Sequence, residues 1–339
     1  MKRTTAILIS ACVAMIVFSC ARDAEEQSPI TYKRVMTSWV KTHYPERISD
    51  TTASGTYILE EIPGTGEKPM DSSFVFVHYT KYYLDGNINS SNREEIARQL
   101  MQYNESDYYG SAIWQLGKGF IPVGVEEVLK EMRAGGSVKI ALPLSASTVD
   151  SLKYNLFSER EDDDNYLYTL SLDRIEQDIT SFGEKTMEAY RDSLFPGLEP
   201  MKAGFYFKKL LETVTEEDGN DTDTIADKSS VYVRYVARRL FDNKVFDTNI
   251  QDTAKKYGLY VSGKQYSPLS ITFYRDSSTM ASENSMVAGF TYAVNRMKYN
   301  EAAVTFFDSD HGYGDKGSGT SVPEYAPLCF TIWTGKNNE

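Results

Sequence analysis

The sequence predicts an α+β protein made of two related domains in tandem, and three observations support this fold class. The chain has 339 residues, which is two to three times the usual length of one domain. Short segments with alternating apolar residues occur in both halves, and this pattern indicates antiparallel strands. Several segments of the first half recur in the same order in the second half. A repeat at only two copies indicates a duplicated domain rather than a solenoid.

The composition is that of an acidic globular protein. Hydrophobic residues make up 41% of the chain and charged residues 25%. The 36 Lys and Arg against 48 Asp and Glu give a net charge of −12, which argues against a nucleic-acid partner, because such a partner requires a basic face. Three His and three Cys are too few for the common zinc centres, so we expect neither a metal nor a cofactor. The 24 Tyr and 16 Phe favour strands and aromatic-lined pockets.

The N-terminus carries the pattern of an export signal. Lys2 and Arg3 precede an apolar stretch at residues 6–18, which is too short for a comfortable permanent span and is followed by Ser19 and Cys20. The pattern resembles a bacterial lipoprotein signal, with a lipid expected on Cys20, although Phe18 is bulkier than the cleavage box usually has. The resemblance implies a protein anchored by its lipid in the membrane of the bacterial cell envelope, on the periplasmic face or the outer-membrane surface. A plain secretory signal is the alternative.

Loss of the signal would leave Cys329 alone, because Cys12 is removed with it and Cys20 would carry the lipid. No disulfide framework is then available. Cys329 lies in a strand-like run at residues 328–333, and we expect a buried apolar side chain rather than a nucleophile.

Two helices are expected outside the strand-rich blocks. The first covers residues 32–44 and ends before Pro45, and the second follows a capping-box pattern formed by Ser181 and Glu184 and ends at residues 196–197. The apolar residues at helical spacing are Val35, Trp39, Val40 and Tyr44 in the first helix, and Phe182, Met187, Tyr190 and Leu194 in the second.

The two strand-rich blocks align with each other. Gly55-Thr-Tyr57 matches Gly204-Phe-Tyr206, and residues 124–132 match residues 289–297 without a gap. Each copy is expected to contain two strands, a long loop, one short amphipathic helix and two further strands.

Six short motifs of the second copy follow one another in a fixed order. They are Val233-Arg-Tyr235, Val245-Phe-Asp-Thr248, Met286-Val-Ala-Gly-Phe290, His311-Gly-Tyr-Gly314, Val322-Pro323 and Leu328-Cys-Phe330. In this order and spacing they resemble the FKBP-type peptidyl-prolyl cis–trans isomerases. That family has a bent antiparallel sheet wrapped on one short helix, with an aromatic pocket between them. Phe290 stands where the family usually has tryptophan.

This resemblance implies the organisation of the whole chain. The expected parts are a signal peptide at residues 1–19, a tether and N-terminal helix at 20–54, an eroded FKBP-like domain at 55–179, a linker helix at 180–200 and an FKBP-like isomerase domain at 201–336.

The resemblance also implies a site and a role for each of its residues. The expected site residues are Tyr235, Phe246, Val287, Phe290 and Phe330 as a cup for the proline ring, Tyr313 as a donor to the substrate carbonyl, and Asp247 at the rim. The implied activity is prolyl isomerisation of proline-containing polypeptide clients, in support of protein folding.

The first copy lacks much of this pattern. Tyr79 is kept and Tyr168 falls on the last-strand phenylalanine, but Ile88-Asn89 stands where Phe-Asp is expected and Val125 takes the tryptophan position. An insertion at residues 145–165 replaces the segment that carries the tyrosine donor. We therefore expect the first domain to bind or to scaffold rather than to catalyse.

Three alternatives remain open at this stage. The chain could be a non-catalytic pair of FKBP-like modules that bind extended segments or partner proteins. The N-terminal helix could be a dimer arm, although it is short for that purpose. The acidic loop at residues 216–223 could hold an ion, but its glycine is misplaced for an EF-hand and a solvated hairpin extension is the better interpretation.

Overall fold

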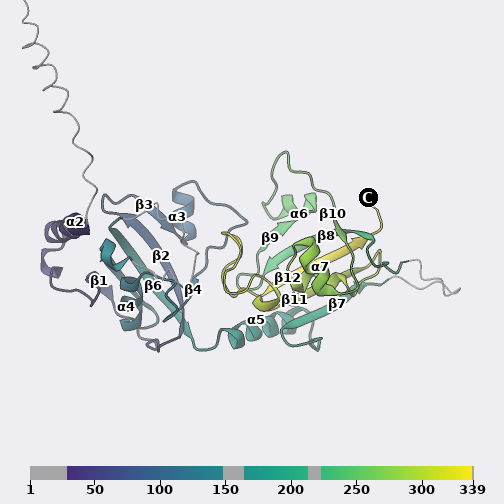
Figure 1. Ribbon diagram of the computed structural model, residues 1–339, viewed down its shortest axis with the longest axis horizontal. Helices are drawn as coiled ribbons and strands as arrows, with labels where there is room; N and C mark the ends of the chain where they lie inside the picture. The colour runs from purple at the N-terminus through teal and green to yellow at the C-terminus, as the bar shows by residue number, and fades with distance from the viewer. Residues whose placement is uncertain (1–28, 148–163, 213–222, 338–339) are drawn as a thin grey trace, which may run out of the picture.

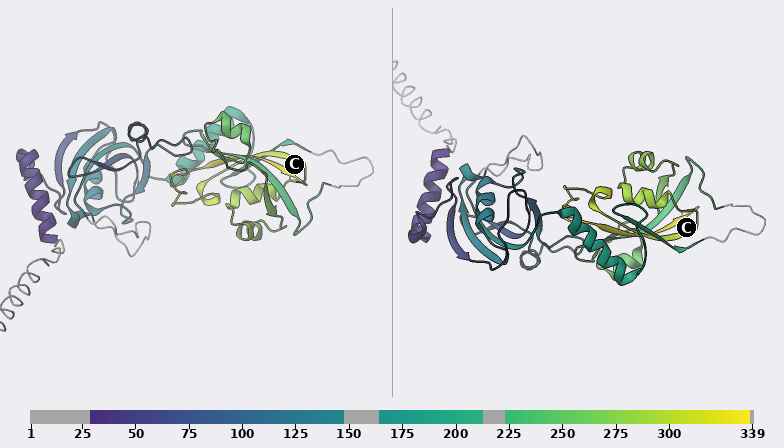
Figure 2. Two further views of the ribbon diagram at one scale, coloured as in Figure 1. Left: turned by 90° about the horizontal axis from the view of Figure 1, so that it is seen from above. Right: turned by 90° about the horizontal axis from the view of Figure 1, so that it is seen from below.

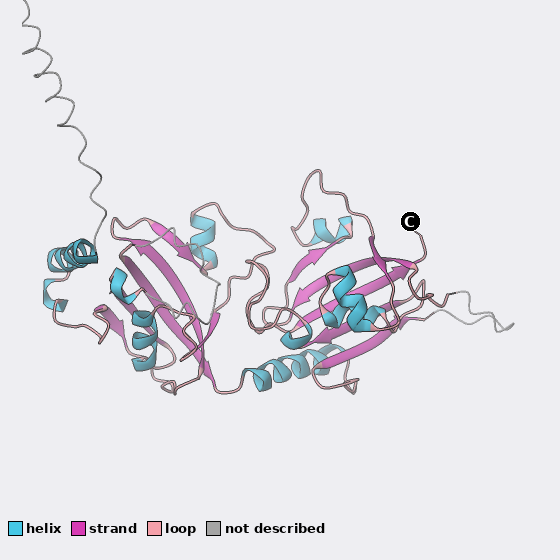
Figure 3. Ribbon diagram, viewed as in Figure 1, coloured by secondary structure: helices cyan, strands magenta, loops and turns pink. Residues whose placement is uncertain are grey.

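The computed structural model describes residues 29–147, 164–212 and 223–337. It contains two six-stranded antiparallel sheets, one in each half of the chain, and each sheet wraps around a short helix (Figures 1 and 3). The predicted α+β class with two related domains in tandem is confirmed. The signal segment, most of the insertion at residues 145–165 and most of the acidic loop at residues 216–223 lie outside the described residues. None of the helices in the described ranges combines the length and apolar character that a bilayer crossing requires.

The first domain follows an N-terminal helix. Its elements are α2 (Pro29–His43), η1 (Pro45–Arg47), β1 (Tyr57–Ile62), β2 (Phe74–Tyr83), β3 (Ile88–Ser91), α3 (Glu94–Gln99), β4 (Ala112–Gln115), α4 (Val123–Glu131), β5 (Gly136–Leu142), η2 (Leu144–Ala146) and β6 (Tyr166–Glu176).

The second domain follows a longer helix. Its elements are α5 (Ile179–Leu194), β7 (Phe205–Leu211), β8 (Ser230–Arg239), β9 (Val245–Thr248), α6 (Gln251–Lys256), β10 (Leu269–Thr272), α7 (Ser277–Asn284), α8 (Ala288–Val294), β11 (Ala302–Phe307), η3 (Ser309–His311) and β12 (Leu328–Gly335).

The two sheets have the same topology. The first has the order β1-β5-β6-β2-β3, with β4 paired to β2, and the second has the order β7-β11-β12-β8-β10, with β9 paired to β8. Both β2–β3 and β8–β9 carry a register shift at the same point of the hairpin, between Lys81 and Tyr82 in one and between Ala237 and Arg238 in the other. The two sheets therefore agree in strand order and also in the position of this register shift, as expected for a duplicated domain.

A glycine lets the short helix approach the sheet in each domain. A Cβ on Gly289, in the first turn of α8, would collide with the ring of Phe307 in β11. A Cβ on Gly124, at the matching place in α4, would collide with Thr56 and Leu142. This shared constraint explains why residues 124–132 and 289–297 align without a gap.

A helix also covers the back of each sheet, away from the short inner helix (Figure 2). In the first domain α2 packs Met36 and Val40 against β1, β5 and β6, in a cluster with Leu59, Ala141 and Leu167. In the second domain α5 packs Met187 in a cluster with Tyr206, Phe306 and Cys329. Ala141 and Phe306 occupy matching positions of β5 and β11, so the repeated unit is a helix followed by a domain.

The two predicted helices are present, but details of both predictions are wrong. Val35 is 47% exposed, and Met36 takes its place on the apolar face of α2. In α5 the cap is not Ser181, because the side chain of Asp178 accepts hydrogen bonds from the backbone of Thr180 and Ser181. Leu194, predicted on the apolar face of α5, is exposed at its last turn.

The close approach at Gly289 predicts a contrast between two glycine substitutions. Gly289→Ala would force the helix away from Phe307 and is expected to destabilise the protein by about 1–3 kcal/mol. Gly183→Ala, in the middle of α5 with nothing within 4 Å of the new methyl group, should stabilise by about 0.5–1 kcal/mol through helix propensity. Melting temperatures of the two variants would measure the contrast. Equal shifts of one sign would contradict this account of the packing.

Candidate functional site

Two neighbouring strands place aromatic rings on the inner face of the second sheet. Strand side chains alternate between the two faces, so one residue in two faces the helix α8. The inward residues include Val231, Val233, Tyr235 and Ala237 of β8, and Leu328, Phe330 and Ile332 of β12. The sequence alternation therefore brings Tyr235 and Phe330 to the same surface.

The first turn of α8 adds the opposite wall. Val287 is the N-cap residue in extended conformation, and Phe290 follows three residues later, buried against the sheet. Because Gly289 has no side chain, the turn sits low enough for the Phe290 ring to reach the strand residues.

Three rings form the centre of the candidate site. The ring centroids of Phe290 and Phe330 are 5.4 Å apart, and Tyr235 lies 6.0 Å from Phe290 and 6.2 Å from Phe330. Phe307 stacks on Phe330 at 5.7 Å with nearly parallel planes. The structure brings the five residues proposed for the cup into one apolar cluster: Tyr235, Phe246, Val287, Phe290 and Phe330. The arrangement is an aromatic wall of the kind that binds apolar ring groups.

The hairpin strand β9 brings a carboxylate to this wall. Tyr235 donates a hydrogen bond from its hydroxyl to Oδ2 of Asp247 at 2.6 Å, and Nζ of Lys264 lies 3.8 Å from Oδ1 of the same carboxylate. Asn249 fixes the hairpin by accepting from the backbone N–H of Tyr235 and donating to the carbonyl of Val233. Within the described ranges, no group of three or more His, Cys, Asp or Glu side chains is arranged to hold a metal ion.

Tyr313 lies at the open side of the site, just after η3. It is 37% exposed, and its hydroxyl is close enough for an electrostatic interaction with Asp247. Burial, and then the charge of Asp247, raise the pKa of Tyr313 above its ordinary value. The same causes raise the pKa of Tyr235 further. Both phenols therefore remain protonated at neutral pH and can act as hydrogen-bond donors.

Two members of this neighbourhood were not predicted. Lys264 comes from the loop between α6 and β10, far from any family-like motif, so nothing in the sequence links it to Asp247. Phe307 could have been found, because the run Thr305-Phe-Phe307 ends a predicted strand and alternation places one of the two phenylalanines inward.

The structure corrects the alignment of the first domain by one residue. Asn92 bridges the backbone of Tyr79 and Val77 as Asn249 bridges that of Tyr235 and Val233. Counting back from this shared asparagine, Ser90 takes the position of Asp247 and Asn89 that of Phe246. The pair Ile88-Asn89 is therefore not the equivalent of Phe-Asp. In agreement with this, the hydroxyl of Tyr79 interacts with the side chain of Ser90.

The first domain has different residues at the positions of Phe290 and Phe330. Val125 is buried at the position of Phe290, and Tyr168 pairs across the sheet at the position of Phe330. Trp114, from β4, packs on Tyr79 with centroids 5.6 Å apart. The first domain thus keeps the framework of the site but lacks the floor ring and the carboxylate.

The fold and the site together define a sheet-and-helix domain with a cluster of aromatic rings between the sheet and the helix, and without a metal-binding cluster among its described residues. The model of the family described as FKBP-type peptidyl-prolyl cis-trans isomerase matches residues 222–333, about a third of the chain. This segment contains every aromatic residue of the site, so the second domain is similar in sequence to the FKBP-type peptidyl-prolyl cis-trans isomerases. No curated protein matches the chain.

Solved structures of the same kind resemble it distantly. A peptidyl-prolyl cis-trans isomerase from Pseudomonas syringae is 21% identical, with a TM-score of 0.32, and the match covers 48% of this chain and 94% of that one. The three FKBP domains of wheat FKBP73 are 17% identical, with a TM-score of 0.29 and coverage of 84% and 94%. The N-terminal domain of FKBP42 from Arabidopsis thaliana is 15% identical, with a TM-score of 0.28 and coverage of 40% and 88%. At these TM-scores the overlays carry no argument about function.

Cys329 lies on the opposite face of β12 from Phe330, in the cluster beneath α5, so it is not part of the site. Burial raises the pKa of its thiol to about 11. We expect the thiol to be unreactive at pH 8, because it is both protonated and covered. In a chain whose Cys12 and Cys20 are replaced by serine, a thiol reagent should label Cys329 only after unfolding. Rapid labelling of the native protein would contradict this placement.

Proposed function

We propose that the second domain catalyses the cis–trans isomerisation of X–Pro bonds. The observation that carries this proposal is the convergence of Tyr235, Phe290 and Phe330 beside the hydrogen-bonded Asp247, inside the segment that matches the isomerase family. A pyrrolidine ring is a small apolar group that fits against such rings, so the substrates are polypeptides with an accessible proline.

The reaction requires no nucleophile or cofactor. Rotation about X–Pro is slow because amide resonance holds the bond planar, with a barrier of about 20 kcal/mol. The half-rotated amide has lost this resonance and is less dipolar than the planar one. An aromatic wall with little water favours it, and each ~1.4 kcal/mol of preference for the rotated state accelerates the reaction tenfold.

Fixed donors add to this preference. The hydroxyl of Tyr313 is protonated and partly exposed, so it can donate to the substrate carbonyl when that carbonyl turns. The hydroxyl of Tyr235 is already engaged by Asp247, and this bond orients both side chains at the rim. In this proposal, Asp247 shapes the site and Tyr313 contacts the reacting amide.

This assignment predicts that matched substitutions in the two domains have different effects on the rate. Asp247→Ala should lower kcat/KM by about tenfold, a loss of ~1.4 kcal/mol, because Tyr235 loses its partner and the rim its charge. Ser90→Ala, at the equivalent position of the first domain, should leave the rate unchanged. A protease-free assay with a short Ala-Pro-Phe peptide would measure both. A larger loss for Ser90→Ala than for Asp247→Ala would indicate that the first domain catalyses the reaction, and would contradict the proposal.

A non-catalytic binding role is the second candidate. It is favoured by Phe290, which is smaller than the family's usual tryptophan and lacks its N–H donor, and by the missing floor ring of the first domain. In this case the full-length protein would isomerise the peptide at the buffer rate. It would still suppress aggregation of an unfolded client, and Tyr313→Ala or Phe330→Ala would not change that suppression.

We further propose that the protein acts on folding clients at the bacterial cell envelope, held there by a lipid on Cys20. The support is the sequence of residues 2–20, a basic start and an apolar core that end in Ser19-Cys20. The acidic net charge is compatible with polypeptide clients rather than nucleic acid.

Replacement of the lipid-bearing residue tests the anchor. Cys20→Ser should abolish incorporation of a labelled fatty acid and move the protein from the membrane fraction to the soluble fraction. Cys12→Ser, within the segment to be removed, is the matched control and should change neither. Membrane association that survives Cys20→Ser would support a different anchor.

A further inference from the structure

The loop that carries Tyr313 also lies at the junction between the two domains. We call residues 312–327, between η3 and β12, the flap (Figure 1). Val322 is buried in the same apolar cluster as the site rings, whereas Tyr325 packs edge-on against Phe74 of the first domain at 5.3 Å. One segment therefore lines the site and contacts the neighbouring domain.

A loop of the first domain holds the middle of the flap. We call residues 103–109, between α3 and β4, the clamp loop. Its Tyr108 donates its backbone N–H to the carbonyl of Thr320 at 2.8 Å, and Thr320 donates its hydroxyl to Asp107 at 2.8 Å. Farther along, the carboxyl group of Glu324 accepts a hydrogen bond from the backbone of Ile113 in β4. These contacts hold the flap at Thr320 and at Glu324.

Arg239, at the end of β8, joins the clamp loop to the flap. Its side chain is 0% exposed, and Nη1 donates to the carbonyls of Ser106 at 2.7 Å and Ser321 at 2.5 Å. Nη2 lies 3.0 Å from Oδ2 of Asp242. A buried guanidinium is costly unless it is paired and hydrogen-bonded, so these partners hold the residue in one position.

The same guanidinium contacts a ring of the site. Its central carbon lies 5.8 Å from the ring centre of Phe246 and 5.6 Å from that of Tyr108 in the clamp loop. Arg239 therefore touches the site, the flap and the first domain at once.

The fold itself does not require an arginine here. Tyr83 occupies the equivalent place in the first domain, since Tyr83 and Arg239 both close their hairpins through their backbone N–H groups, to Asn87 and Lys244 respectively. The arginine is thus a feature of the second domain, at a hairpin that contacts the first domain through Ser106.

We propose that Arg239 is a positioning residue of the isomerase site, and that through it the clamp loop of the first domain fixes the flap and Phe246 of the second. The first domain then contributes to the activity of the second by fixing the positions of the residues that line its site. This inference rests on the proposed function of the second domain.

The decisive variant is on the first domain, away from the pocket. In the full chain, Asp107→Ala removes the acceptor of Thr320 and should lower kcat/KM by about three- to tenfold, mainly by raising KM, because the flap samples more positions. Asp107→Asn keeps an acceptor oxygen and should restore most of the activity. Arg239→Leu should cause a larger loss, of more than tenfold, and Asp107→Ala decides the question if the Arg239 variant does not fold.

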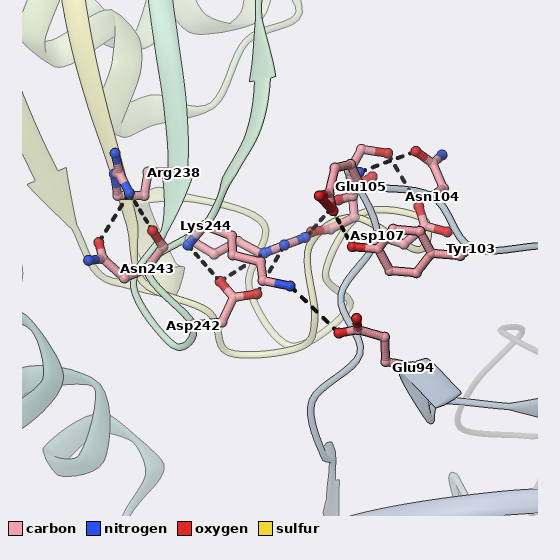
Figure 4. A network of polar contacts seen from close by, with 12 residues as sticks. Glu94, Tyr103, Asn104, Glu105, Asp107, Arg238, Asp242, Asn243 and Lys244 are labelled. Carbon is pink, nitrogen blue, oxygen red and sulfur yellow. Dashed lines mark hydrogen bonds and ion pairs between the residues drawn. The ribbon is translucent and has the colours of Figure 1, made fainter. Parts of the chain in front are cut away.

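An ion pair across the same junction provides the matched control. Lys244 lies 3.7 Å from Glu94 of the first domain but is not bonded to the flap (Figure 4). Lys244→Gln should leave kcat/KM unchanged. Hydrogen exchange at the backbone amides of residues 314–325 should be faster in Asp107→Ala than in Lys244→Gln, with similar melting temperatures.

The outcomes separate this inference from the proposed function. If the parent protein isomerises the peptide and Asp107→Ala matches it in both kcat/KM and flap exchange, the positioning role is wrong while the activity stands. If the parent matches the buffer rate, the proposed function fails, and the positioning role fails with it. An equal loss in Asp107→Ala and Lys244→Gln would indicate general docking of the domains, not a role of the flap, and would also overturn the inference.

Discussion

The close contact between a short helix and a sheet is the constraint on which the second domain depends. With no side chain at Gly289, the first turn of α8 rests on Phe307, and Phe290 reaches the rings of Tyr235 and Phe330. The same contact exists at Gly124 in the first domain, but Val125 follows it and no floor ring results. The same close approach therefore supports two frameworks, and the residue after the glycine is one of the differences that decide whether the three rings meet.

Features encoded in short segments could be predicted from the sequence. The convergence of Tyr235, Phe290 and Phe330 was implied by the resemblance of the ordered motifs to a known family, and the alternation of the strands agrees with the inward direction of Tyr235 and Phe330. The first-domain residue that matches Asp247 could not be predicted correctly, because the match depends on the length of the turn before it. The turn after Tyr83 is one residue shorter than the turn after Arg239, as the hydrogen bonds to Asn87 and Lys244 show, and a sequence comparison had no marker for the missing residue.

Contacts between distant segments escaped prediction for a different reason. Lys264 reaches Asp247 from a loop without periodicity, and Arg239 binds the carbonyl of Ser106 only when the two domains are docked. Backbone carbonyls leave no trace in the sequence as acceptors. The sequence contained one sign of this contact: Arg239 is charged, whereas its equivalent in the first domain is Tyr83. A charged residue near the end of a strand by itself indicates only an exposed side chain.

The helix that precedes each domain has a consequence for where the chain can be divided. α5 shields Phe306 and Cys329 on the back of the second sheet, as α2 shields Ala141 and Leu167 on the first. A fragment beginning near residue 201 would leave these side chains open to water and prone to self-association. A fragment that keeps these side chains covered begins at Asp178, the cap of α5. Phe182, near the start of the same helix, packs against Phe76 of the first domain, so α5 covers the second sheet and contacts the first domain as well.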